Sequence, residues 1–202
     1  LHSIFTLVMA WVVLGAAGLL FPRNLTWVSR VLFPFGAVVA AAIAVCAYAA
    51  LALPPETATL PIGLPELPMH LRLDALSAFF LLLIGTAVAG VSIYSAGYFR
   101  SGEGAVPGLM CLQYHVFLAS MAMVVLADDA FAFMVAWETM AVSSYFLVTT
   151  QHRVAEIRSA GFLYLLLAHI GAIGLLLCFG VLQGGSWQFT FDAMRAATLT
   201  PG

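Results

Sequence analysis

Charged residues are scarce in this sequence, and lysine is absent altogether. Only 8% of the 202 residues are charged, whereas 63% are apolar, and all seven basic residues are arginine. Soluble domains carry about 25% charged residues, so a soluble protein of this size could not cover its surface with so few charges. The lipid bilayer must therefore be the solvent for most of the chain.

The sequence also lacks the clusters that reactive sites need. Cys46, Cys111 and Cys178 lie far apart inside apolar runs and form no CxxC pair, so an iron–sulfur cluster or a Cys/His metal site has no ligand set. No phosphate loop, dinucleotide fingerprint, nucleophile elbow or arginine-rich stripe is present. We expect no cofactor, no metal, no redox centre in this chain and no nucleic-acid partner, and we interpret the cysteines as small buried hydrophobes.

What the sequence does contain is long apolar runs, and a transmembrane helix needs about 20 mostly apolar residues. The sequence predicts an all-α integral membrane protein with about six such helices, over residues 3–21, 31–53, 74–99, 106–127, 130–150 and 157–182. No positively charged segment precedes the first run, which is too long for the apolar part of a signal peptide. We interpret it as a spanning helix.

The connecting segments divide the chain into three parts. Residues 1–103 hold the three leading helices and a Pro-rich surface loop at 54–73, which we expect to be an extended loop or a short hairpin because its five prolines exclude a helix. Residues 104–183 hold helices four to six. Residues 184–202 combine a Gly-Gly pair with alternating aromatic and charged residues, which indicates an interfacial tail.

The arginines predict the orientation. Five of them, Arg23, Arg30, Arg100, Arg153 and Arg158, lie in or beside the odd-numbered links, against Arg72 and Arg195 in an even-numbered link and the tail. Cytoplasmic loops carry the excess of arginine and lysine in membrane proteins. We therefore expect the odd links in the cytoplasm and the N-terminus and tail outside.

Of the sixteen charged residues, Glu138 alone lies deep in a predicted span. It lies about 12 Å into a hydrocarbon core that is about 30 Å thick. A carboxylate there costs a few kcal/mol, and the low dielectric disfavours its charged form. A carboxylate poised between its two forms can take up and release protons. We predict that Glu138 carries protons; the alternative is a neutral glutamic acid that hydrogen-bonds between helices.

Three further side chains are candidates for a proton pathway. His169 lies midway along the sixth predicted helix, and an imidazole can pass a proton through its two nitrogens; a hydrogen bond between helices is the equal alternative. His115 in the fourth helix is a weaker candidate, and a structural role is favoured for it. Tyr145 is also weaker: it falls on the face of Glu138 seven residues further on, where it lines a hydrated path or an ordinary helix interface.

Three segments of the sequence resemble a known superfamily. They are FMVAWETMAVSSYFLV over residues 133–148, LRLDALSAF over 71–79 and LYLLLAHIG over 163–171. The ending TLTPG over 198–202 is similar as well. The likeness is to the antiporter-like membrane subunits: the proton-pumping subunits of respiratory complex I, the Mrp-type cation/proton antiporters, and the large subunits of hydrogenase-4 and formate hydrogenlyase. Within this superfamily, the sequence looks most like hydrogenase-4 component B.

The resemblance implies a function and site residues. Glu138 matches the helix-five glutamate of the family, which is thought to pair with a lysine two helices later, and His169 matches a helix-six histidine of the hydrogenase-type subunits. The family members are longer and carry two inverted repeats. The sequence stops after the sixth helix, so we expect the N-terminal part of such a subunit, with the first repeat incomplete and the partner lysine absent.

The resulting hypothesis is a non-catalytic membrane subunit of a hydrogenase-4-like complex in the inner membrane of a prokaryote. It would contribute to proton or cation translocation coupled to electron transfer, with other membrane subunits as its partners. One alternative is an antiporter-like subunit of the Mrp or complex I (NADH:quinone oxidoreductase) kind. Another is a structural membrane anchor that does not pump.

Overall fold

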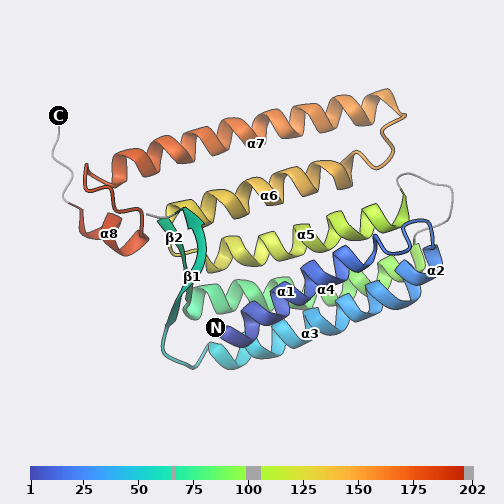
Figure 1. The fold of residues 1–202 in the computed structure, drawn as a ribbon, viewed down its shortest axis with the longest axis horizontal. Helices are drawn as coiled ribbons and strands as arrows, with labels where there is room; N and C mark the ends of the chain where they lie inside the picture. The colour runs from blue at the N-terminus through green and yellow to red at the C-terminus, as the bar shows by residue number, and fades with distance from the viewer. Residues whose placement is uncertain (65–66, 99–105, 198–202) are drawn as a thin grey trace.

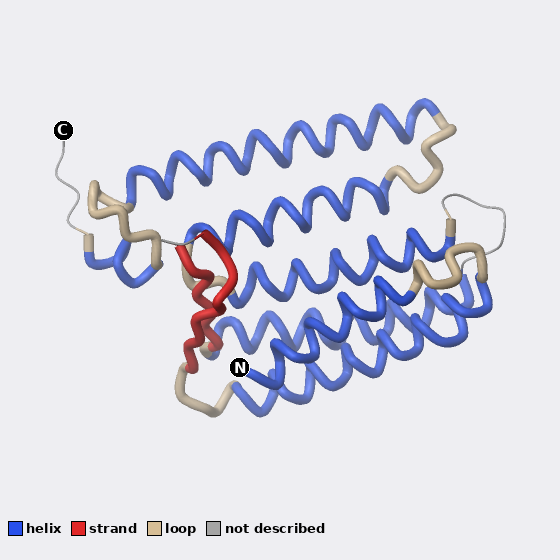
Figure 2. The backbone as a smooth tube through the Cα atoms, in the orientation of Figure 1, coloured by secondary structure: helices blue, strands red, loops and turns tan. Residues whose placement is uncertain are grey.

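The computed structural model describes residues 1–64, 67–98 and 106–197. Pro65, Arg100 and the segment 198–202, which entered the sequence predictions, lie outside the described residues. Long helices run side by side along the molecule and are joined alternately at its two ends, as Figure 1 shows. The only strands within the described ranges form a hairpin at one end, drawn in red in Figure 2.

Within the described residues, five helical segments are long and apolar enough to cross a membrane. They are Leu25–Ala50, Ala75–Tyr98 (α4), Pro107–Leu126 (α5), Ala130–Val148 (α6) and Ala155–Leu182 (α7). The first of these is a composite of a short helix α2 (Leu25–Trp27), a π-helical segment η1 (Val28–Leu32) and α3 (Phe33–Ala50). The prediction of a helical membrane protein is confirmed, and the chain is an integral membrane protein.

The first helix is shorter than predicted. Helix α1 covers His2–Ala17, 16 residues, rather than 3–21, and so spans only about 24 Å at 1.5 Å per residue. The chain turns at Gly18, where its backbone meets α5: a Cβ built on Gly108 would lie 2.2 Å from the Gly18 carbonyl oxygen. The amide of Gly108 also donates to the carbonyl of Pro22 at 2.8 Å. This backbone-to-backbone contact ends α1 early.

The second span starts six residues earlier than predicted, at Leu25 instead of residue 31. The Asn24 side chain accepts a hydrogen bond from the amide of Trp27 at 3.0 Å and so caps the helix. Arg30 therefore lies in the helix and not in a link.

The Pro-rich segment forms an antiparallel hairpin. Strand β1 (Glu56–Leu64) pairs with β2 (Leu67–Leu73), and the register shifts between Leu60 and Gly63. The hairpin lies across the end of the bundle, close to the start of α4 and to the short tail helix α8 (Phe191–Ala196). Its β2 strand buries Leu71 and Leu73 against the helices.

Helices α1, α3, α4 and α5 form the packed core of the bundle. α3 packs on α4, and α1 packs on α5 and α3. The centre is filled by large and small apolar side chains in alternation, among them Ile4, Val8, Trp11, Ala40, Ile43, Ala78, Leu81, Leu118 and Leu126. Helix α6 covers α5, and α7 packs mainly on α6 at the outer edge. Only Gly161 and Ala172 of α7 are buried, so its remaining faces point away from the described chain.

Candidate functional site between helices α6 and α7

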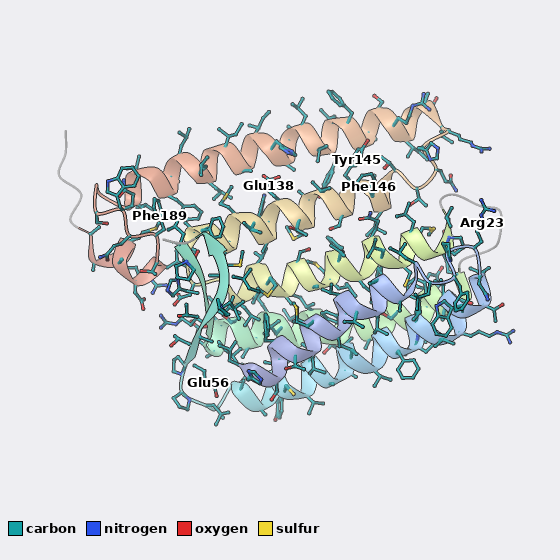
Figure 3. All side chains as sticks on the ribbon, in the orientation of Figure 1. Arg23, Glu56, Glu138, Tyr145, Phe146 and Phe189 are labelled. Carbon is teal, nitrogen blue, oxygen red and sulfur yellow. The ribbon has the colours of Figure 1, made fainter. Side chains whose placement is uncertain are left out.

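Glu138 and His169 face each other across the contact between α6 and α7. Glu138 lies near the middle of the 19-residue α6, and His169 near the middle of the 28-residue α7. The Nε2 atom of His169 is 3.4 Å from the Oε2 atom of Glu138. Figure 3 shows the Glu138 side chain in the space between the two helices. The structure thus brings the two leading sequence candidates together; that they carry protons stays a prediction.

The hydrogen bond on the other side of the imidazole fixes its tautomer. His169 Nδ1 is 2.9 Å from the carbonyl oxygen of Leu165, one turn earlier in α7. A carbonyl oxygen can only accept, so Nδ1 carries a hydrogen. Nε2 of a neutral His169 is then a bare acceptor that faces a carboxyl oxygen. The two facing atoms attract each other only when one proton lies between them, on the carboxyl or on the imidazole.

The face that holds this pair is open in the described chain. The side chains of Glu138 and His169 are 37% and 48% exposed, although both lie at the centre of apolar helices. At this depth the surroundings are lipid or further protein, and a charge in contact with lipid is costly. A pair that shares one proton has no net charge, which lowers this cost.

Trp137 directly precedes Glu138 in α6. Its ring stacks on Phe133 at 5.7 Å with an interplanar angle of 20°. The indole Nε1 is buried and has no hydrogen-bond partner among the described residues. Buried indole N–H groups usually have a partner, so this donor is an unpaired polar group on the residue before Glu138. Sequence reasoning missed it, although the Trp-Glu dipeptide was the available signal.

Tyr145 lies along α6 from Glu138, toward the opposite end from the hairpin (Figure 3). It lies at a close approach of α6 to α7: a Cβ built on Gly161 would be 3.3 Å from the Tyr145 ring and 2.3 Å from the Thr149 methyl group. Seven residues correspond to about 10.5 Å along a helix, so Tyr145 and the Glu138–His169 pair occupy separate layers of one interface. No hydrogen bond joins these two layers among the described residues.

His115 lies elsewhere, inside the core of the bundle. Its side chain is fully buried and stacks on Phe33 with a centroid distance of 6.0 Å. Nδ1 is 2.8 Å from the carbonyl oxygen of Cys111, and Nε2 has no partner among the described residues. A Cβ built on Gly36 would lie 2.7 Å from this Nε2. These contacts are with α3 and α5, and nothing in the described chain joins His115 to Glu138 or His169.

A polar cluster that sequence reasoning missed closes the hairpin end of the bundle. The Asp129 carboxylate accepts from the amide of Ala132 at 2.6 Å, which caps α6, and from the amide of His70 in β2. The Nδ1 atom of His70 lies 3.2 Å from the same carboxylate. Arg72 contacts both oxygens of Asp192 in α8 at 3.1 Å. The cluster ties the hairpin, the α5–α6 turn and the tail together; the Asp-Asp pair before an apolar run was a capping signal.

Burial raises the pKa of the neighbouring Asp128 carboxyl, and the Arg72 guanidinium opposes this shift. The backbone of Asp128 joins the same cluster: its amide donates to the carbonyl of His70 at 2.9 Å, and its carbonyl accepts from the amide of Phe191 at 3.0 Å.

The site and this cluster both lack metal-ligand geometry, because no group of three His, Cys, Asp or Glu side chains is close enough to hold a metal ion in the described ranges.

Comparison with known proteins identifies relatives of this chain. It is 37% identical over 134 residues to hydrogenase-4 component B of Escherichia coli (strain K12). The aligned residues make up 66% of this chain and 20% of that protein. It is 28% identical over 143 residues to NADH-quinone oxidoreductase subunit L of Mycobacterium tuberculosis. The aligned residues make up 69% of this chain and 22% of that protein. The chain thus spans about a fifth of the length of the curated relatives it matches.

The fold has a counterpart in solved structures. A chain in the structure of the Mrp complex from Dietzia sp. DQ12-45-1b matches 96% of this chain with a TM-score of 0.79 and 22% identity, over 21% of its own length. No protein-family model matches the sequence. The apolar helices, these relatives and the shared fold lead to one conclusion: the chain is a homologue of antiporter-like membrane subunits.

Proposed function

We propose that this chain is part of a membrane subunit that moves protons through the complex it belongs to, with the Glu138–His169 pair as the proton-carrying site. The observation that carries the proposal is the 3.4 Å approach of His169 Nε2 to Glu138 Oε2 in the middle of two apolar helices. An ionisable pair at this depth is costly and marks a function by default.

The pair works by holding one proton between two acceptors. Because Nδ1 of His169 stays bound to the Leu165 carbonyl, only Nε2 exchanges a proton with Glu138. A nearby positive charge favours the Glu138 carboxylate and disfavours the His169 imidazolium, so it promotes release of the shared proton, and its removal favours proton uptake. A proton can therefore enter at one residue and leave from the other while the helix backbones stay in place.

The 37% identity to hydrogenase-4 component B favours a hydrogenase-4-like respiratory complex. The electron-transfer chemistry would lie in other subunits, and other membrane subunits would be the partners. The expected location is the prokaryotic cytoplasmic membrane, and the arginine distribution supports an orientation with the N-terminus outside.

A second candidate is a subunit of NADH:quinone oxidoreductase or of a cation/proton antiporter, supported by the 28% identity to subunit L. The two candidates differ in what drives proton movement. Proton uptake that requires hydrogenase turnover supports the first. Uptake driven by NADH oxidation or by a sodium gradient supports the second.

The test is Glu138→Gln in the complete complex, measured as proton uptake into inverted membrane vesicles with a pH-sensitive dye. Gln keeps the shape and the hydrogen bonding but cannot carry a proton, so uptake is expected to fall by at least about tenfold. Glu156→Gln is the matched control: Glu156 is exposed in the first turn of α7, and its loss should leave uptake unchanged.

Unchanged proton uptake and unchanged turnover in Glu138→Gln would overturn the proposal and favour a structural anchor. Infrared difference spectra add a readout that does not depend on turnover. The pair should show a carboxyl or carboxylate band that disappears in Glu138→Gln and shifts in His169→Leu, because each partner sets the protonation of the other.

A further inference from the structure

The end of the bundle opposite the hairpin contains a cavity that the proposed function does not use. The starts of α5 and α7 and the end of α6 enclose a space of about 560 Å³. Ligand sites in proteins occupy about 300–1,000 Å³, so the space is large enough for part of a sizeable ligand. Figure 3 shows Tyr145 and Phe146, which form its α6 wall, at this end of the helix.

The walls of the cavity are mainly apolar, with Gln113, Thr149 and Thr150 as polar lining residues. Val106, Leu109 and Met110 line it from the α5 side, and Phe146 and Leu147 from α6. Leu109 and Phe146 are 42% and 48% exposed, so the cavity is open to whatever lies beside the bundle. In a membrane these walls contact acyl chains, because exposing an apolar surface to water is unfavourable in free energy.

The rim of the cavity is basic. His152, Arg153 and Arg158, from the link between α6 and α7 and from the first turns of α7, line it. Nη1 of Arg158 donates to the carbonyls of His152 and Arg153 at 2.7 and 3.2 Å, which holds its guanidinium across the link. No carboxylate is among the described lining residues. The rim thus offers two positive charges at the level where lipid headgroups lie.

We propose that this cavity binds an anionic phospholipid. Its phosphate would contact Arg153 and Arg158, and an acyl chain would lie along the Leu109 and Phe146 wall. The argument is charge complementarity together with depth: guanidinium groups recognise phosphate, and basic pockets between transmembrane helices bind anionic headgroups. A zwitterionic lipid fills the apolar part equally well but gains much less from the two arginines.

The experiment measures the lipid that stays bound to the purified protein after reconstitution in nanodiscs with equal amounts of phosphatidylglycerol and phosphatidylcholine. The wild-type chain should retain phosphatidylglycerol in preference, and Arg153→Gln should lower this preference by about fivefold. Arg30→Gln is the matched control, because Arg30 is exposed on η1 at the same end of the bundle and does not line the cavity.

Two further arms separate the lipid from simpler explanations. Leu109→Trp fills the apolar wall without changing any charge, and it should lower retention of both lipids. Inorganic phosphate added in excess should not displace phosphatidylglycerol, since the acyl contacts remain. Equal retention of both lipids by the wild type, an equal loss in Arg30→Gln, or full displacement by inorganic phosphate would each overturn the proposal.

Discussion

A backbone carbonyl decides what the Glu138–His169 pair can do. Because the oxygen of Leu165 accepts from Nδ1, the exchangeable nitrogen of His169 is the one that faces Glu138. The sequence could predict that both residues lie deep, since position along a helix follows from its rise per residue. It could not predict that the residues face each other, because the relative rotation of two helices depends on packing at distant positions such as Gly161.

His115 illustrates the opposite case at the same scale. Its depth in an apolar helix resembles that of His169, yet the structure places it against Gly36 and Phe33 inside the core. Composition and periodicity treat the two histidines alike. What separates the two histidines is the residue that each one faces on another helix. His169 faces Glu138 of α6, whereas His115 faces Gly36 and Phe33 of α3.

Asp74 provides a prediction about a single hydrogen bond. Its carboxylate accepts from the amide of Ser77 at 2.9 Å at the start of α4, and this bond holds the pKa of the Asp74 carboxyl below its ordinary value. Asp74→Ala should destabilise the protein by about 1 kcal/mol at neutral pH. The measurement is unfolding in mixed micelles. Asp74→Asn is the control and should lose little, because an amide oxygen also caps a helix.

The cost of Asp74→Ala should also depend on pH. A carboxyl whose pKa is lowered by folding stabilises the folded state above its ordinary pKa, and the contribution is lost as the pH falls through the lowered value. The difference between the wild type and Asp74→Ala should therefore shrink in strong acid. A difference that stays constant across this range would mean that the charge of Asp74 contributes nothing to the cap.

At the scale of the elements, apolar length predicted the long helices well and their ends less well. α5 and α7 begin within two residues of the predicted positions. The early end of α1 could not be predicted, because it depends on the contact between Gly18 and Gly108, which are far apart in the sequence. The early start of the second span could have been predicted from Asn24, a preferred capping residue.

Gly161 gives a prediction for the α6–α7 interface. A Cβ at this position would lie 2.3 Å from the Thr149 methyl group, and Thr149 is held by a 2.8 Å hydrogen bond to the carbonyl of Tyr145. Gly161→Ala must separate the helices or break this bond, so it should destabilise the protein by about 1–3 kcal/mol. It should also lower proton uptake in the complete complex, because it widens the gap between Glu138 and His169.

Gly174→Ala is the matched control for this prediction. Gly174 lies on the same helix, and a Cβ there meets nothing within 4 Å. The substitution should be neutral or slightly stabilising, since alanine favours a helix over glycine. If both glycine variants lose the same stability and the same uptake, the close approach at Gly161 does not position the pair.

At the scale of the whole molecule, the alternating links sort the arginines between the two ends. Arg23, labelled in Figure 3, lies at the end away from the hairpin, as do the α6–α7 link with Arg153 and the start of α7 with Arg158 (Figure 1). Arg72 in β2 and Arg195 in α8 lie at the hairpin end. Arg153 in the α6–α7 link and Arg158 at the start of α7 also line the proposed lipid site. One distribution of charge therefore predicts both the direction of insertion and the place where an anionic headgroup binds.

The orientation itself is the remaining prediction. Ser186, exposed in the tail, and His152, exposed in the link before α7, lie at opposite ends of the bundle and can each be replaced by cysteine. If the arginine-rich end faces the cytoplasm, a membrane-impermeant maleimide should label Ser186→Cys in intact spheroplasts. His152→Cys should be labelled only in inverted vesicles or after the membrane is permeabilised. The wild type is the control, because Cys46, Cys111 and Cys178 all lie within spanning helices, which the impermeant reagent does not enter. The reverse labelling pattern would place the arginine-rich end outside. It would also place the proposed lipid site in the outer leaflet, so the same two variants test how the whole molecule lies in the membrane and which leaflet supplies its lipid.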